Sequence, residues 1–187
     1  MEQHTGSNIG SEIRQLRKAK GLTLHDVAAA IGRSVGYVSQ AERGLSALSI
    51  EDLRRLAAAL EVPLGWFFAH ENVPEEERGF VVRGARRRVL GNSEDGLTEE
   101  LLSPDLGGSF EVVLSSFEPG AGPSAPLQRA TEEVGYLVAG ELRLWIGERC
   151  FDLAAGDSFR LQGQEFRWHN PGAGKATVVW VIAPPIY

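Results

Sequence analysis

The sequence has few of the residues that build cross-linked or membrane-embedded proteins. Its 187 residues include one cysteine, Cys150, so an internal disulfide is excluded. No apolar run approaches the ~20 residues that span a bilayer. The first ten residues, MEQHTGSNIG, lack the apolar core of a signal peptide. We therefore expect a reduced, cytoplasmic protein with no membrane contact.

An excess of basic charge is also lacking, since the formal net charge is −6. Residues 1–70 are nearly balanced, with eight basic and seven acidic side chains, and the acidic excess belongs to the rest of the chain. This balance neither indicates nor excludes a nucleic-acid partner, because local clusters make the contacts to phosphates. Such a cluster is present in the first part: Arg14, Arg17, Lys18, Lys20, Arg33 and Arg43.

Residues 21–44 predict two short helices joined by a tight turn. Thr23 is a suitable N-cap with Asp26 three positions later, and Gly32 suits the C-cap. Ser34 caps the next helix. Helical spacing is shown by Leu24, Val27, Ala28 and Ile31. A short turn with glycine between two such helices is typical of a helix-turn-helix, whose second helix fits the DNA major groove.

This segment resembles the λ-repressor/Cro-like (XRE-type) DNA-binding domain. The shared residues are the Leu22-Thr23 start, Gly32 at the turn and the run SVGYVSQAERG at 34–44. The resemblance covers residues 8–70 and implies an all-α, five-helix domain, with helices over 9–20 and 49–60 and a short final helix from Leu64. The alternative is a helical bundle that serves only protein contacts.

The resemblance implies that the second helix of the motif meets DNA. Gln40 is placed to hydrogen-bond a base edge, and Val35 to touch a thymine methyl group. Glu42 is interpreted as structural, because an acid facing phosphates would repel them. The phosphate contacts are expected from Arg33, Tyr37, Ser39 and Arg43. The full expected set is Thr23, Arg33, Ser34, Val35, Gly36, Tyr37, Ser39, Gln40 and Arg43.

Residues 71–79 (ENVPEEERG) are acidic, lack large apolar side chains and predict a linker. After them the hydrophobic pattern alternates, which predicts many short strands and hence a sandwich or small barrel. The predicted strands are residues 80–83, 88–90, 97–102, 110–117, 134–139, 142–146, 150–153, 158–161, 166–170 and 177–182.

Residues 80–187 resemble the cupin family. One motif is Glu133 followed by Gly140, and the second runs from Gly156-Asp157 to Asn170. The resemblance implies an all-β, jelly-roll cupin barrel after the helical domain.

The metal ligands of the cupin family are mostly absent. The family uses His-x-His, Glu and a later His, and only the glutamate is kept, as Glu133. The His-x-His positions fall on Leu127 and Arg129, or on Pro126 and Gln128 after a one-residue shift. The last position falls on Phe166, and His169 has the opposite strand parity. We therefore expect no metal and no other cofactor.

These replacements predict a small-ligand pocket formed by Arg129, Glu133, Phe166 and Trp168. Glu133 would take an ammonium group and Arg129 a carboxylate, while the rings favour a cation. The alternative is that Arg129 and Glu133 pair with each other inside an inert barrel.

The whole chain resembles bacterial regulators that join these two domains, such as the putrescine-utilisation repressor family. The resemblance implies a homodimeric repressor of a palindromic double-stranded DNA operator, controlled by an amine, amino acid or carboxylate. Trp145 and Trp180 are candidates for the dimer face or for the core. One alternative is a metal-dependent, epoxidase- or dioxygenase-like enzyme with the same two domains. The other is a DNA-binding protein whose barrel only dimerises.

Overall fold

The computed structural model describes residues 5–62, 64–68, 73–90, 95–105, 108–123 and 125–186. The chain divides into two compact units. The first contains residues 1–88, 104–108 and 186–187, and the second contains residues 89–103 and 109–185. Within the described ranges, no helix is long and apolar enough to span a bilayer.

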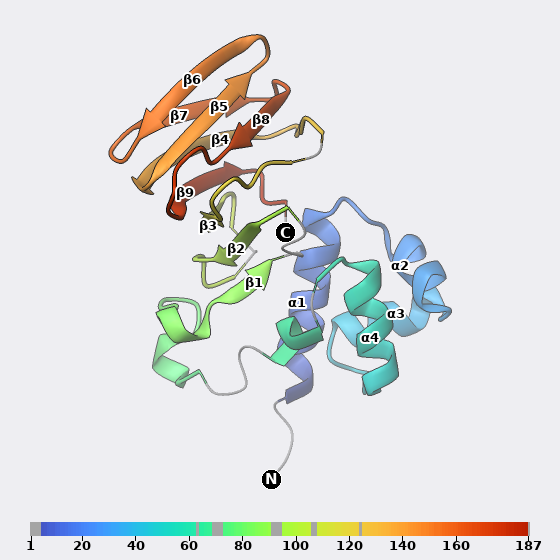
Figure 1. The fold of residues 1–187 in the computed structure, drawn as a ribbon. Coiled ribbons are helices and arrows are strands. Elements are labelled where there is room, and N and C mark those ends of the chain that lie inside the picture. Colours follow the sequence, from blue (N-terminus) through green and yellow to red (C-terminus); the bar gives the residue numbers. More distant parts are fainter. Residues whose placement is uncertain are drawn as a thin grey trace. The chain divides into compact units, whose positions relative to one another are not determined.

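The first unit is helical (Figure 1). Its described part has four α-helices: α1 (Thr5–Ala19), α2 (Leu24–Ile31), α3 (Val35–Glu42) and α4 (Ile50–Ala59). The expected fifth helix is instead a 3-10 helix, η1 (Leu64–Phe68). Its sequence, LGWFF, combines glycine with three aromatic residues, which are weak helix formers, over a length too short for a stable α-helix.

The predicted helix caps of the first unit are confirmed. The Thr23 hydroxyl accepts the backbone N–H of Asp26, and the Asp26 carboxylate accepts that of Thr23. Gly32 ends α2 with a φ of 67°, a left-handed conformation that favours glycine. Ser34 caps α3 through the backbone N–H of Tyr37. The turn between α2 and α3 therefore follows from local residues.

The helices pack around an apolar core. Its fully buried members include Ile13 and Leu16 on α1, Val27 and Ile31 on α2, Leu56 and Leu60 at α4, and Phe67 on η1. Glu42 is also buried, and its carboxylate forms a double ion pair with the Arg17 guanidinium at 2.6 and 3.0 Å. The interpretation of Glu42 as a structural residue is confirmed.

The second unit is built from antiparallel strands (Figure 1). They are β1 (Arg88–Leu90), β2 (Leu97–Leu101), β3 (Glu111–Phe117), β4 (Glu132–Ala139), β5 (Glu141–Ile146), β6 (Arg149–Ala154), β7 (Ser158–Gln162), β8 (Phe166–His169) and β9 (Ala176–Ala183). Nine of the ten predicted strands are thus present to within one or two residues at their ends.

The strand predicted at residues 80–83 is wrong. The backbone N–H groups of Phe80 and Val81 both donate to the Glu77 carbonyl, so the chain curls back on itself. A short helix, η2 (Glu75–Glu77), precedes this turn and another, η3 (Gly84–Arg86), follows it. Phe80 is 83% exposed, so its apolar side chain does not pack against a neighbouring strand.

The strands form two sheets rather than a closed barrel. The larger has the order β1-β2-β3-β9-β4-β7 and the smaller the order β6-β5-β8. Alternate residues of β3, β4 and β9 are buried, as expected for strands with one face toward a core. A single bridge between Leu127 and Phe166 ties the segment before β4 to β8. This bridge lies at the rim of the cavity described below.

Candidate functional site

The expected DNA-reading surface lies on α3 and its flanks. Val35 is 41% exposed, and Gly36, Gln40 and Arg43 are also exposed. Ser39 is half-buried. The Gln40 carbonyl accepts a hydrogen bond from the Ser46 hydroxyl at 3.0 Å, which holds the Gln40 side chain beside the following loop. The Arg43 Nε donates to the Ser39 carbonyl at 3.1 Å. The fold therefore presents these residues to solvent, with Gln40 and Arg43 partly oriented.

Thr23 and Ser34, also expected at DNA, use their hydroxyl groups as helix caps. The Thr23 hydroxyl donates to Asp26 Oδ2 at 2.6 Å and accepts the Asp26 backbone N–H. Both residues are exposed at the surface. Their position beside α3 is thus combined with a structural role.

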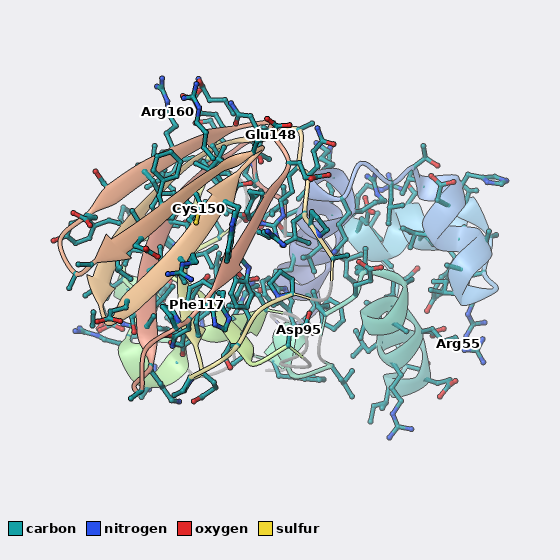
Figure 2. The ribbon with its side chains drawn as sticks, turned by 45° about the horizontal axis from the view of Figure 1, so that its top comes forward. Arg55, Asp95, Phe117, Glu148, Cys150 and Arg160 are labelled. Carbon is teal, nitrogen blue, oxygen red and sulfur yellow. The ribbon has the colours of Figure 1, made fainter. Side chains whose placement is uncertain are left out.

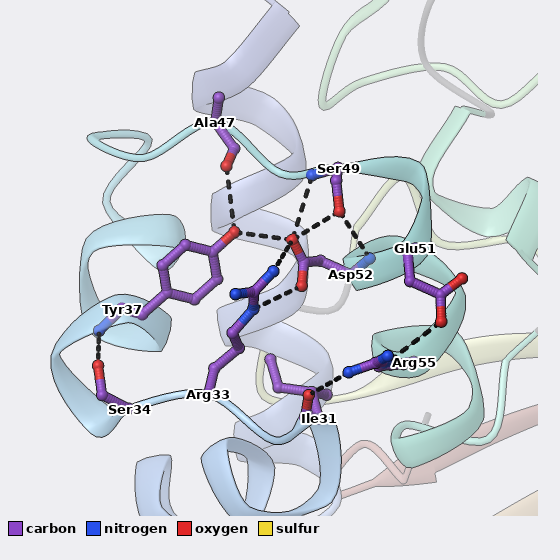
Figure 3. Close-up of polar contacts among 9 residues, drawn as sticks. All are labelled: Ile31, Arg33, Ser34, Tyr37, Ala47, Ser49, Glu51, Asp52 and Arg55. Carbon is purple, nitrogen blue, oxygen red and sulfur yellow. Dashed lines mark hydrogen bonds and ion pairs between the residues drawn. The ribbon is translucent and has the colours of Figure 1, made fainter.

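Asp52 on α4 is the centre of a polar network that joins three helical segments (Figure 3). The Arg33 guanidinium donates to both of its oxygens, at 2.9 and 3.2 Å. The Tyr37 hydroxyl lies 3.0 Å from Asp52 Oδ2, and the Ser49 hydroxyl 2.7 Å. The Arg33 hydrogen bond, with the smaller effect of Ser49, holds the pKa of Asp52 far below its usual range.

This network engages two of the expected phosphate contacts. Arg33 is bound to Asp52, although its side chain remains 47% exposed. The Tyr37 pKa is raised by burial and by the neighbouring Asp52, so its hydroxyl stays protonated. The sequence carries a local signal for this site, because Ser49-x-x-Asp52 repeats the capping-box pattern of Thr23-x-x-Asp26.

A cavity lies between the two sheets of the second unit. Its volume is about 20 Å³, room for roughly one water molecule. It is lined by Leu97, Glu99, Ser115, Phe117, Leu127, Arg129, Glu133, Phe166, Trp168, Trp180 and Ile182. The four residues expected to form a pocket, Arg129, Glu133, Phe166 and Trp168, are thus brought together.

The polar groups of this cavity lie on the larger sheet and on the segment that leads into β4. Glu133 is 2% exposed, accepts a hydrogen bond from the Thr131 hydroxyl at 2.5 Å, and lies 3.9 Å from Arg129 Nη1. On β2 and β3 of the same sheet, the Ser115 hydroxyl donates to Glu99 Oε1 at 2.9 Å. Sequence reasoning missed Glu99 and Ser115, because their inward direction depends on the pairing of β2 with β3.

The walls of the cavity are aromatic. The rings of Phe117 and Trp168 meet edge to face, with their centres 4.5 Å apart. Trp180 is 6% exposed and meets Phe159 in the same way at 5.0 Å. Trp180 is therefore core and not a dimer contact. Trp145 is half-exposed, with the Arg167 guanidinium 4.3 Å from the centre of its ring.

The cavity does not fit the metal of metal-binding cupins. Leu127 and Arg129, not Pro126 and Gln128, line it, and the Gln128 amide donates instead to the Gly163 carbonyl. With Phe166 at the last ligand position, Glu133 is the one metal-type side chain that remains of the family's set. Nowhere in the described ranges do three His, Cys, Asp or Glu side chains gather as metal ligands.

A further buried charge pair lies in the first unit, which includes Arg88 at the start of β1. Glu12 on α1 is 5% exposed and Arg88 is 7% exposed, with Oε1 and Nη2 3.0 Å apart. The Arg88 guanidinium also lies 4.6 Å from the centre of the Trp66 ring. Burial raises the pKa of Glu12 to about 7, against the opposing effect of Arg88. A cavity of about 140 Å³ adjoins the pair, lined also by Ser11, Gln15, Arg78, Gly79, Pro104 and Asp105.

Comparison with known proteins identifies the class of both units. Residues 13–67 match the family described as "Helix-turn-helix", and residues 113–182 match the "Cupin domain" family. The chain is 32% identical over 98 residues to the transcriptional regulator ClgR of Mycobacterium tuberculosis (strain ATCC 25618 / H37Rv), covering 51% of this chain and 87% of that protein. The chain belongs to the XRE-type helix-turn-helix transcriptional regulators, here with a cupin domain.

Individual relatives extend along the whole chain. The HTH-type transcriptional regulator PuuR of Escherichia coli (strain K12) is 20% identical over 180 residues, covering 95% of this chain and 96% of that protein. The crystal structure of an HTH_3 family transcriptional regulator from Vibrio cholerae is 23% identical and covers 96% of each chain, with a TM-score of 0.43. The two family matches place the helix-turn-helix before the cupin domain, which is the predicted order.

Proposed function

We propose that this transcriptional regulator is a homodimeric repressor that binds a palindromic operator through α3 and is controlled by a small metabolite in the sandwich cavity. The observation that carries the proposal is the presence, in one chain, of an exposed helix-turn-helix and a cavity lined by charged groups and aromatic rings. Apolar and aromatic walls with a few convergent polar groups are the usual lining of a small-ligand site, although this cavity has a volume of about 20 Å³ in the structure.

The cavity has a binding role in this proposal and no catalytic one. Leu127, Arg129 and Phe166 occupy the positions where metal-binding cupins place histidines, so the enzyme alternative lacks its ligands. The relatives that match the chain are themselves called transcriptional regulators. The effector classes that match the cavity charges are amines, amino acids and carboxylates.

In the proposed complex α3 lies in the major groove. Gln40 reads a base edge through its amide nitrogen while its carbonyl oxygen stays bonded to Ser46. Val35 contacts a thymine methyl group. Phosphates are held by Arg43, by the backbone near Gly36 and by the exposed part of Arg33, which fixes the position of α3 without reading sequence.

An exposed apolar surface on the larger sheet supports the homodimer. Val134, Tyr136 and Val138 on β4 are 43, 48 and 47% exposed, and the adjacent Val181 on β9 is 42% exposed. We call these four residues the β4–β9 face. Arg160 on the neighbouring β7 (Figure 2) is the cross-strand partner of Val134 and forms an ion pair with Glu132 at 3.3 Å. Two copies joined here present two copies of α3, as a palindrome requires.

The DNA-reading role is tested by Gln40→Ala. After the operator is found by sequencing genomic DNA retained by the purified protein, affinity is measured by fluorescence anisotropy on operator and on unrelated DNA. We expect Gln40→Ala to weaken operator binding about tenfold or more, because one base contact carries about 1–3 kcal/mol of discrimination. Binding to unrelated DNA should be nearly unchanged.

Ser46→Ala is the matched control for this test. It removes the same Ser46–Gln40 hydrogen bond but leaves the Gln40 amide available to a base. Operator affinity close to wild type is expected. An equal loss on operator and unrelated DNA in Gln40→Ala would remove Gln40 from base recognition, and failure to retain any specific sequence would overturn the repressor proposal.

A further inference from the structure

The sandwich cavity is too small, as it stands, for any metabolite. Its volume of about 20 Å³ holds roughly one water molecule. Most of its walls are fixed by packing, since Phe117, Phe166, Trp168, Trp180 and Ile182 are at most 6% exposed. A ligand therefore needs one wall residue to leave.

Arg129 is a wall residue with little restraint in the structure. Its side chain is 27% exposed, whereas that of its partner Glu133 is 2% exposed. Within the described part of the chain its guanidinium makes one ion pair, at 3.9 Å, which is longer than a hydrogen bond. Rotation of this side chain toward solvent enlarges the cavity without disturbing either sheet.

When the Arg129 guanidinium leaves the cavity, the acidic residues that remain there determine the charge of the group that can replace it. Glu133 would remain buried with the Thr131 hydroxyl but without a cation, which is costly for a carboxylate. Glu99 adds a second carboxyl group to the same cavity. An anion in this position would face both acids. A cation restores the pair and also gains the faces of the aromatic rings.

We infer that the Arg129 guanidinium occupies the position that a small organic cation takes, and that the effector binds by displacing this guanidinium. We call this position the seat. The seat is formed by Glu133, Glu99 and the aromatic walls. This inference rests on the proposed effector-binding role and changes one part of it: Arg129 closes the site and does not anchor a ligand carboxylate.

The inference is tested by restoring the missing cation to Arg129→Ala. N-ethylguanidinium has the atoms that this substitution deletes, and N-ethylurea is its neutral counterpart. Binding is measured by isothermal titration calorimetry and by the shift in melting temperature. We expect N-ethylguanidinium to bind Arg129→Ala at least roughly tenfold more tightly than wild type, because the seat is occupied in wild type for most of the time.

Glu133→Gln in the Arg129→Ala background should abolish this binding, and N-ethylurea and propionate should bind neither protein. Arg129→Gln, whose neutral side chain still fills part of this space, should bind N-ethylguanidinium more weakly than Arg129→Ala, and circular dichroism verifies that each variant is folded.

Two results would overturn the inference, and they differ in meaning. Propionate binding to wild type that is lost in Arg129→Ala would make Arg129 an anion anchor, with the effector-binding proposal intact. If N-ethylguanidinium and propionate bind neither wild type nor Arg129→Ala, the cavity is a sealed core, and the effector-binding proposal fails together with the inference. In either case the operator experiment with Gln40→Ala stands independently.

Discussion

Buried acidic side chains recur in both units, and four of them are each paired with an arginine. The four pairs are Glu12 with Arg88, Glu42 with Arg17, Asp52 with Arg33, and Glu133 with Arg129. A buried charge without a partner is strongly destabilising, so such pairs are required wherever a charge is kept inside. The pairs differ in the balance of forces: the Asp52 pKa is lowered by its hydrogen bonds, whereas the Glu12 pKa is raised by burial.

The raised pKa of Glu12 predicts a pH dependence of stability. Between about pH 4.5 and 7 the folded protein keeps a proton on Glu12 that the unfolded chain has lost. Stability therefore falls as the pH rises through this window, by up to an amount on the order of 3 kcal/mol. Glu12→Gln should flatten this slope.

The slope is measured by urea unfolding of the helical unit, followed by circular dichroism, at several pH values across the window. Glu61→Gln, a substitution at an exposed glutamate, should keep the wild-type slope. If Glu12→Gln has the same slope as wild type, burial does not control the protonation of Glu12.

Among the helices, the placement of α3 depends on residues outside it. Asp52 binds Arg33 in the turn before α3 and lies within hydrogen-bonding distance of Tyr37 on α3 itself. The same carboxylate completes the capping box of α4 with Ser49 (Figure 3). One side chain thus links the start of α4 both to the turn before α3 and to α3 itself, the helix that we propose to read DNA.

Asp52→Asn tests this link. It preserves the size of the side chain but removes the charge that binds Arg33, so we expect a loss of about 2–4 kcal/mol in the free energy of unfolding. Operator binding should weaken as well, since α3 loses a restraint. Because the Asp52 pKa is lowered in the folded state, the Asp52 carboxylate stabilises the fold fully at pH values above the ordinary carboxyl pKa. This stabilisation is lost as the pH falls below that value toward the pKa of the folded state.

Glu51→Gln is the matched control for Asp52→Asn. Glu51 is the preceding residue of α4, and its exposed ion pair with Arg55 spans one helical turn. Its removal should cost less than about 0.5 kcal/mol. Equal effects of the two substitutions in urea unfolding would contradict the central role of Asp52.

For the complete chain, the proposed function requires a second copy. In the proposed complex the helical unit supplies one DNA-reading helix, and the sandwich has an exposed apolar surface, the β4–β9 face, on two adjacent strands of its larger sheet. In a two-fold interface each residue of this face is present twice, so a single substitution acts on both sides.

Val134→Glu is therefore expected to raise the dimer dissociation constant by roughly tenfold or more, since it places two charges in the buried centre of the interface. The measurement is light scattering after size-exclusion chromatography, over a range of protein concentrations. Phe151→Glu is the control, because Phe151 is 42% exposed on β6 of the other sheet. Dissociation by Phe151→Glu, or none by Val134→Glu, would place the interface elsewhere.

Much of the architecture was predictable because its signals are local. Thr23, Gly32 and Ser34 act on residues within one helical turn, and the alternation along β3, β4 and β9 reports which side of each strand is buried. The two wrong predictions, a strand at residues 80–83 and a fifth α-helix, concern segments whose structure the local pattern does not determine. Residues 80–83 have a strand-like composition but no partner, and η1 is too short for the helical pattern to prevail.

The sequence by itself determined the helix caps, the order of the two domains and the replacement of the family's histidines by Leu127, Arg129 and Phe166, because each depends on residue identity or on near neighbours. Only the tertiary structure decided that Asp52 engages Arg33 and that Glu99 and Trp180 enter the cavity of Glu133. These partners are far apart in the chain, and strand register and helix packing, which no local pattern encodes, bring them together.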